Sequence, residues 1–144
     1  MATSTPNIMG RIVYEGDLHT SATHLRSGNV IVTDGPIDNR GRGEAFSPTD
    51  LFATALASCI LSIMGIAAMD RDIDMAGTTA EVVKEMDGPP RHIAAVRIVI
   101  RFPAKPFTAS EKRILEKAAE SCPVGRSIHP NVEQDVKLIW SETA

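Results

Sequence analysis

The sequence contains few residues of the types that hold metals, and no motif that holds a nucleotide. Its 144 residues include two cysteines and four histidines, and the histidines lack the short spacings of metal ligands. No G-x-G-x-x-G or Walker motif occurs, so nothing indicates a dinucleotide or a nucleoside triphosphate. We therefore expect neither a metal site nor a cofactor. The four histidines are His19, His24, His92 and His129.

Clusters of one charge are also missing. Charged residues make up 23% of the sequence, the formal net charge is -3, and basic residues are scattered along the chain. A nucleic-acid-binding protein would show a basic patch or stripe instead. The length and composition are those of a globular protein large enough for one core. We interpret residues 1–144 as a single domain and expect no nucleic-acid partner.

One segment, residues 51–69, almost lacks charge and is about as long as a membrane span requires. Small residues dominate it, and no second apolar segment or basic flank accompanies it. A buried core helix explains this segment better than a membrane span. The N-terminus shows no charged region followed by an apolar stretch, so no signal sequence is predicted. We expect a cytoplasmic protein without a membrane partner.

β-branched and aromatic residues punctuated by glycine predict two or three short strands within residues 8–34. Period-two alternation predicts a long antiparallel hairpin from residues 78–87 and 92–103, with Arg97 on its solvated face. Residues 131–140 alternate in the same way and predict a final strand. Together with two helices between these strands, the order of elements predicts an α+β fold with antiparallel sheets.

Two segments carry helix-start signals. Ser47 precedes a proline and is followed by Asp50 at the third helical position, and the helix is expected to run to about Asp70. Because apolar residues lie on nearly all sides of this helix, one small sheet would leave part of it uncovered, and a second subunit could complete its burial. Thr108 forms a predicted capping box at the start of a second helix, residues 109–121.

The long helix contains the first of the two cysteines, Cys59. Helical geometry directs apolar side chains close to its thiol, and burial among them raises the pKa of a thiol and makes it inert. An arginine within hydrogen-bonding reach would offset this by about 1–3 pKa units. Arg40 and Arg42, in a Gly- and Pro-rich loop over residues 35–48, are the candidates. The apolar residues expected around the thiol include Phe52, Ala55 and Ile63.

The second cysteine, Cys122, directly precedes Pro123, as a residue at the cap of a short helical turn does. Free amides and the local dipole at such a cap favour the thiolate, and the side chain need not be deeply buried. The residues alone leave two interpretations of both cysteines open. Each is either a reactive thiol or a small packed side chain, since free cysteine is among the most buried residue types.

Two motifs resemble the OsmC/Ohr family of hydroperoxide-resistance proteins. The first is the helix start "SPTDLFATALASC", which follows the pattern P-x-[DE]-L-(x)7-C, and the second is "SCPVGRSIHP" with its C-P-V. The likeness extends from about residue 8 to residue 140. It implies an OsmC-like fold, with antiparallel sheets packed around a long central helix, in an intertwined homodimer whose sites lie at the subunit interface.

The resemblance also implies a thiol-dependent peroxidase. Cys59 would attack an organic hydroperoxide and become a sulfenic acid, and Cys122 would condense with it to a disulfide. A dithiol reductant, of the lipoyl type or another thiol, would reopen that disulfide. The active-site arginine of the family aligns best with Arg40, and Arg42 is the alternative.

The chain departs from the family at the first helical turn. Thr49 occupies the position at which the well-characterised peroxidase branches have a glutamate that orients the arginine. Asp50 comes one residue later, about 180° around the helix from Cys59, whereas Thr49 is about 80° away. Asp50 is then most simply a helix-start carboxylate, and Glu44 is a substitute for the orienting acid. The alternative function is therefore an OsmC-like redox or small-hydrophobe-binding protein with little peroxidase activity.

Overall fold

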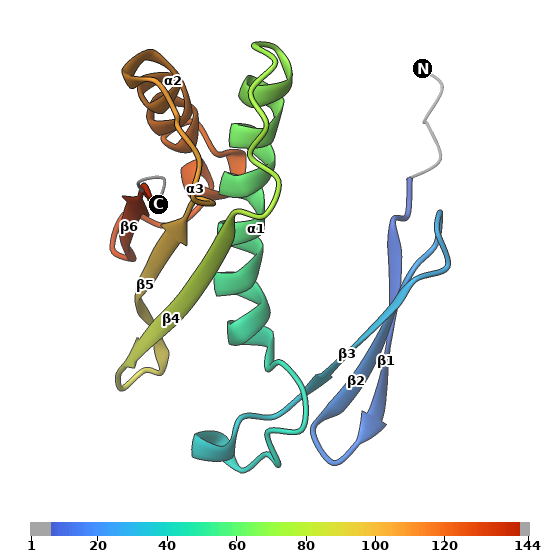
Figure 1. The fold of residues 1–144 in the computed structure, drawn as a ribbon. Coiled ribbons are helices and arrows are strands. Elements are labelled where there is room, and N and C mark those ends of the chain that lie inside the picture. The colour runs from blue at the N-terminus through green and yellow to red at the C-terminus, as the bar shows by residue number, and fades with distance from the viewer. Residues whose placement is uncertain (1–6, 142–144) are drawn as a thin grey trace, which may run out of the picture. The chain divides into compact units, whose positions relative to one another are not determined.

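The computed structural model describes residues 7–141, which form two compact units that divide between Leu51 and Phe52 (Figure 1). The first unit contains a small sheet and a loop. The second contains another sheet, two shorter helices and most of the long helix α1, Pro48–Met69. Each unit is described below by itself.

The first unit is built on three antiparallel strands, β1 (Gly10–Gly16), β2 (His19–His24) and β3 (Val30–Asp34), in that order. The predicted meander over residues 8–34 is confirmed. Successive side chains of a strand point to opposite faces, and the neighbours Ile12 and Val13 are both exposed, Ile12 by 71%. Apolar side chains are therefore uncovered on both faces of this sheet.

Helix α1 begins with a reciprocal cap. The Ser47 hydroxyl accepts a hydrogen bond from the Asp50 amide (3.1 Å), and the Asp50 carboxylate accepts one from the Ser47 amide (2.9 Å). Two otherwise unsatisfied amide groups are thus paired, as in a capping box. The predicted helix start is confirmed, and the helix ends at Met69, one residue before the expected end.

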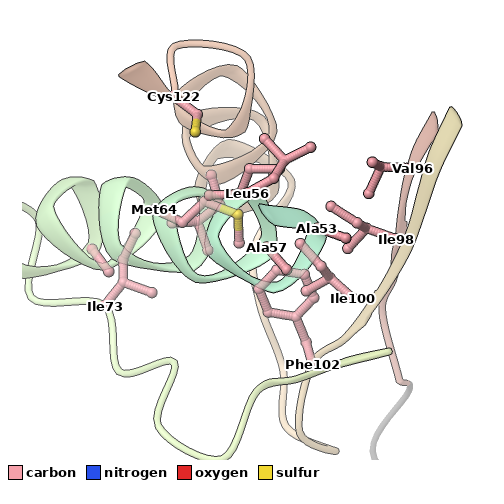
Figure 2. Packing of buried hydrophobic residues seen from close by; sticks show 13 residues of the cluster. Ala53, Leu56, Ala57, Met64, Ile73, Val96, Ile98, Ile100, Phe102 and Cys122 are labelled. Carbon is pink, nitrogen blue, oxygen red and sulfur yellow. The ribbon is translucent and has the colours of Figure 1, made fainter. Parts of the chain in front are cut away.

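Burial of α1 on all sides stays a prediction for a dimer, because the single chain covers only part of the helix. One stripe is covered, and Ile66, on another side, is 56% exposed. By length and composition α1 is the one helix within residues 7–141 that could cross a membrane, although core helices of soluble proteins share these properties. Its covered stripe packs into the main hydrophobic cluster (Figure 2). The stripe consists of Ala53, Leu56, Ala57, Ile60, Met64 and Ala68.

The sheet of the second unit contains β4 (Thr79–Asp87), β5 (His92–Arg101) and β6 (Glu133–Ile139) in that order. The predicted β4–β5 hairpin is antiparallel as expected. The prediction of purely antiparallel sheets is wrong, because β6 runs parallel to β5. Helices α2 (Ala109–Ala119) and α3 (Pro123–Arg126) lie between these two strands in sequence and return the chain so that β6 runs in the same direction.

The main core of the second unit lies between α1 and β5. The inward side chains Val96, Ile98 and Ile100 of β5 are at most 1% exposed and face the covered stripe of α1 (Figure 2). Leu115 of α2 is also fully buried in this cluster. Burial of each such side chain stabilises the fold by about 1.5–3 kcal/mol. This packing fixes the position of α1, and with it that of Cys59, within the unit.

The opposite face of this sheet carries a charged network centred on Arg97. Its guanidinium donates to Glu85 of β4 (2.7 and 3.1 Å), and to Glu133 (3.1 Å) and Asp135 (3.3 Å) of β6. One side chain of the central strand thus contacts both neighbouring strands. The hydrogen bonds to Arg97 hold the pKa of Glu85 below its usual value. The predicted solvated or cross-strand-paired role of Arg97 is confirmed.

Replacing Arg97 by methionine is expected to lower the free energy of unfolding at pH 7 and to have less effect at pH 3. Glu85 has a lowered pKa in the folded state, so the contribution of its contact is present above its unfolded pKa and lost as pH falls through the folded value. Urea unfolding at the two pH values measures the difference.

Arg101→Met is the matched control, because Arg101 also lies on β5 and pairs with one carboxylate, that of Glu81. Its effect should be smaller than that of Arg97→Met at pH 7. If Arg97→Met lowered the free energy of unfolding equally at pH 7 and pH 3, the result would contradict a contribution from the charged network.

Candidate functional site

The second unit brings the two thiols together. Cys59 lies on α1 and is partly exposed, whereas Cys122 is the N-cap residue of α3 and is only 3% exposed. The Cys122 sulfur accepts a hydrogen bond from the Gly125 amide (3.4 Å), as predicted for a cap, and is turned toward α1 (Figure 2). There Cys122 belongs to the buried hydrophobic cluster against which the Cys59 side chain packs, and Cys59 is close enough to influence the pKa of Cys122.

The expected preference of Cys122 for the thiolate is wrong, because its pKa is raised. Burial is the largest cause, and the hydrogen bond with Cys59 is the second. The Gly125 amide lowers the pKa, but by less than burial raises it. Sequence reasoning weighed the cap and underestimated the loss of hydration, which disfavours the charged form of a thiol. Cys122 therefore keeps its proton to higher pH than an exposed cysteine.

This difference gives the two sulfurs distinct chemical capacities. A protonated, buried thiol is a poor attacker of peroxides, because the thiolate is the nucleophile. The same thiol can supply a proton to its neighbour and can condense with a sulfenic acid formed there. Cys122 is thus suited to follow a reaction at Cys59 rather than to begin one.

The first unit organises the arginine loop, residues 35–47, through one buried carboxylate. Asp34 is 2% exposed, and its two oxygens accept hydrogen bonds from the amides of Gly35 (3.0 Å) and Glu44 (2.9 Å). Its own amide donates to the Phe46 carbonyl (3.1 Å). Asp34 thereby holds both ends of the loop. The sequence analysis missed it, although an aspartate before a Gly- and Pro-rich loop is the kind of residue that bonds nearby backbone amides.

The loop backbone also packs on itself. A side chain at Gly41 would overlap the Gly35 carbonyl, so only glycine fits there. Gly43 has φ +64°, a conformation that other residues rarely adopt. The Gly43 amide donates to the Gly35 carbonyl (3.0 Å). Arg42 is therefore held between two glycines, and the loop has a defined shape although it contains only one short 3₁₀ turn, Ile37–Asn39.

The two candidate arginines have different surroundings. Arg40 lines a cleft of about 470 Å³ with Tyr14, Leu18 and Pro48. Arg42 lines a cleft of about 230 Å³ together with four carboxylates. Both arginines also line a cleft of about 510 Å³ with Asp17, so Arg40 has one carboxylate beside its clefts and Arg42 has four. The four carboxylates belong to Glu15, Asp17, Asp34 and Glu44.

Asp50, Thr49 and Glu44 are the residues considered near the start of α1 for orienting an active-site arginine. Asp50 caps the helix, as described above, and Thr49 contacts the Ser47 hydroxyl through its own hydroxyl (3.1 Å). Glu44 lines the cleft that contains Arg42. Glu44 is therefore placed in the same cleft as a candidate arginine, Arg42.

The residues predicted to form a substrate pocket lie on α1 near the covered stripe. Phe52 is 37% exposed, Ala55 is exposed and Ile63 is partly buried. They are thus open to a ligand or to another protein surface in the single chain. Within residues 7–141, no group of three or more His, Cys, Asp or Glu side chains could hold a metal ion.

The fold has counterparts among known proteins. A model of the family described as OsmC-like proteins matches residues 41–137, a range that includes both cysteines and the arginine at position 42. The chain belongs to the OsmC-like family. The resemblance noted in the sequence is confirmed.

Solved structures agree with this assignment. A protein from Psychrobacter arcticus 273-4, provisionally named for osmotic stress induction and the detoxification response, is 48% identical, with a TM-score of 0.90 over 96% of this chain and 100% of its own. An organic hydroperoxide resistance protein OsmC from Legionella pneumophila is 18% identical, with a TM-score of 0.69 over 93% and 98%. OhrB of Bacillus subtilis, an organic hydroperoxide resistance protein, is 18% identical, with a TM-score of 0.63 over 92% and 98%.

The last two likenesses show the OsmC-like α+β fold alone. No match was found among curated proteins.

The raised pKa of Cys122 predicts slow alkylation at neutral pH. In the folded protein, the pH midpoint for reaction of Cys122 with iodoacetamide should lie above that of a free thiol, about 8.5. Cys59→Ala should lower this midpoint without bringing it to the free value, because burial remains. Mass spectrometry of the Cys122 peptide across a pH series measures it.

Ser58→Ala, a change at the exposed neighbouring residue of the same helix, is the control and should leave the midpoint of Cys122 unchanged. A midpoint for Cys122 below that of the urea-unfolded chain would contradict the assignment of a buried thiol.

Asp34→Asn is expected to loosen the arginine loop. The amide group of asparagine replaces one acceptor by a donor, so the amide of Gly35 or of Glu44 loses its partner, at a cost of about 1–3 kcal/mol. Hydrogen exchange at the Glu44 amide should accelerate, and the urea midpoint should fall. Asp72→Asn, at an exposed position, is the control. Unchanged exchange at Glu44 would show that Asp34 does not hold the loop.

Proposed function

We propose that this OsmC-like protein is a thiol-dependent peroxidase that reduces organic hydroperoxides. The observation that carries the proposal is the packing of Cys59 against the hydrophobic cluster that contains Cys122, in which Cys122 is the buried thiol with a raised pKa. In such a pair, Cys59 can react with a peroxide, and Cys122 can condense with the sulfenic acid that forms. The names of the relatives from Legionella pneumophila and Bacillus subtilis, which refer to organic hydroperoxide resistance, support the same activity.

In the first step, the Cys59 thiolate attacks the terminal oxygen of the hydroperoxide. The O–O bond breaks, and the alkoxide leaves with the electron pair and takes up a proton to become an alcohol. Cys59 becomes a sulfenic acid. Cys59 suits this role because it is partly exposed, and apolar side chains of α1 such as Phe52 and Ile63 lie on the helix near it. An apolar surround favours alkyl or aryl hydroperoxides over hydrogen peroxide.

In the second step, Cys122 attacks the Cys59 sulfenic sulfur, and water leaves with the sulfenic oxygen. The product is the Cys59–Cys122 disulfide. Because both cysteines belong to one packed cluster of the same chain, this step is unimolecular, which accelerates it strongly over attack by an external thiol. A dithiol then reduces the disulfide and restores both thiols. A reducing compartment such as the cytoplasm fits this cycle.

We assign the activating positive charge to Arg40 rather than to Arg42. Four carboxylates around one of its clefts offset the charge of Arg42, whereas Arg40 shares a cleft with one carboxylate, that of Asp17, and lines another with Tyr14, Leu18 and Pro48. A cation in less compensated surroundings stabilises a thiolate and a departing alkoxide more strongly. Glu44 lines the cleft of Arg42, so we do not assign it as the partner of Arg40.

We further propose that the protein acts as a homodimer. Support comes from the exposed apolar side chains on both faces of the β1–β2–β3 sheet and from Ile66 and Met69 on α1. Apolar surface of this extent on one chain is characteristic of surfaces that bind another protein. A second copy of the chain would bury it.

Consumption of cumene hydroperoxide with dithiothreitol as the reductant tests the activity. Cys59→Ser should fall to the uncatalysed background. Cys122→Ser should still consume one equivalent of hydroperoxide by oxidation of Cys59, but should turn over at least about tenfold more slowly without an internal disulfide.

Arg40→Gln and Arg42→Gln form a matched pair that tests the assignment of the arginine. Arg40→Gln should slow oxidation of Cys59 by about 10-fold or more, the effect of losing one pKa unit or more of thiolate stabilisation at pH 7. Arg42→Gln should change the rate by less than about threefold. The opposite ranking would assign the role to Arg42. A wild type no faster than Cys59→Ser would contradict the peroxidase and favour the redox or hydrophobe-binding alternative.

A further inference from the structure

A cleft of about 420 Å³ opens beside Cys122, entirely within the second unit. It lies between α2, α3 and β6, which are neighbours in the fold (Figure 1). Its walls combine apolar side chains, among them Ala119 and Leu138, with the charged side chains of Glu116, Glu120 and Arg126. A cleft of this size accommodates a small organic molecule. None of these charged residues takes part in the proposed oxidation of Cys59.

Of the two cysteines, Cys122 lines the cleft. Cys122 is among the lining residues, whereas α1 contributes Ile60 rather than its neighbour Cys59. Cys122 therefore lies between two different surroundings, the hydrophobic cluster against which Cys59 packs and the cleft. Once the two cysteines are joined, a molecule in the cleft meets the Cys122 end of the disulfide.

The identity of the attacked sulfur decides which cysteine is released. In thiol–disulfide exchange, the attacked sulfur forms a mixed disulfide and the other sulfur leaves as a thiolate, faster when its pKa is lower. Burial raises the pKa of Cys122, which slows its departure as a thiolate. Attack at Cys122 releases Cys59 in the first step and leaves the departure of Cys122 to the intramolecular second step. The position of the cleft and the chemistry of exchange thus both favour attack at Cys122.

We propose that the reducing dithiol binds in this cleft and attacks Cys122, and that the cleft selects uncharged alkyl dithiols over anionic ones. The inference rests on the proposed peroxidase function, because it concerns the disulfide that the peroxidase cycle forms. The first thiolate of the dithiol bonds to Cys122, the Cys59–Cys122 bond breaks, and Cys59 leaves with the electron pair.

The second thiol of the reductant completes the exchange. It loses its proton and attacks the reductant sulfur of the mixed disulfide, so the reductant becomes a cyclic disulfide. Cys122 leaves with the electron pair and takes up a proton. Two electrons pass from the dithiol to the protein, and both cysteines end reduced.

The charges around the cleft give the selectivity. Glu116 and Glu120 supply two negative charges and Arg126 one positive charge, so the charged lining carries a net charge of about −1 near pH 7. Glu116 also accepts a hydrogen bond from the Trp140 indole (3.3 Å), which places its carboxylate between α2 and the end of the last strand. In water, repulsion between this net charge and an anionic reductant about 7 Å away slows the reaction by roughly threefold relative to an uncharged reductant.

Trapping of the mixed disulfide tests which sulfur is attacked. The protein is oxidised with diamide, so that no hydroperoxide activity is needed, and is then treated briefly with 2-mercaptoethanol, quenched with acid and alkylated with iodoacetamide. Peptide mass spectrometry should find mercaptoethanol on Cys122 and the alkyl group on Cys59. Mercaptoethanol predominantly on Cys59 would overturn the proposal.

A pair of reductants that differ in charge tests the cleft itself. 2,3-Dimercaptopropanol should reduce the diamide-oxidised protein about threefold faster, relative to a small disulfide standard, than 2,3-dimercaptopropanesulfonate. Glu120→Lys should abolish or reverse this preference. Asp70→Lys makes the same change of charge at an exposed position outside the cleft and should keep it. If Glu120→Lys preferred the uncharged reductant as strongly as the wild type does, the cleft would be ruled out as the binding site.

The two levels of the proposal fail separately. If hydroperoxide does not oxidise Cys59 while diamide forms the disulfide and mercaptoethanol appears on Cys122, the peroxidase is overturned and the reduction route stands. If hydroperoxide oxidises Cys59 but mercaptoethanol appears on Cys59, the reduction route alone is overturned. If neither oxidant links the two cysteines, both are overturned.

Discussion

The packing of α1 against β5 is the constraint on which the candidate chemistry depends. The covered stripe of α1 meets Val96, Ile98 and Ile100, and this contact fixes the rotation of the helix about its axis. A rotation by one residue, about 100°, would carry the Cys59 thiol away from Cys122. The hydrophobic core therefore does more than stabilise the second unit. It selects which side of α1 presents a sulfur to the cap of α3.

The sequence predicted the elements well wherever a local signal determines them. Reciprocal caps at Ser47 and Thr108 set both helix starts, and alternation located the β4–β5 hairpin. Strand direction is a different matter, because alternation of side chains is the same in parallel and antiparallel strands. The parallel pairing of β6 follows from where the chain returns after α2 and α3, which no local pattern records.

The candidate site shows the same division between local and long-range determinants. The cap position of Cys122 could be predicted from the following proline, but its burial depends on α1, which lies more than fifty residues earlier in the sequence. The expectation that the cap favours the thiolate of Cys122 failed for that reason. Asp34, Glu120 and Arg126 escaped notice because each is an ordinary charged residue in the sequence, and only the fold places them at a loop end or beside a thiol.

The two bonds of Asp34 have a consequence for the evolution of the arginine loop. Surface loops usually tolerate insertions and deletions, because little fixes their length. Here Asp34 ties residues 35 and 44, and Gly41 packs directly on Gly35, so the segment between them has one permitted length. These backbone contacts therefore fix the number of residues between β3 and Arg40. Within OsmC-like proteins that share this aspartate and these glycines, length variation should be displaced to other connections, such as the turn between β4 and β5.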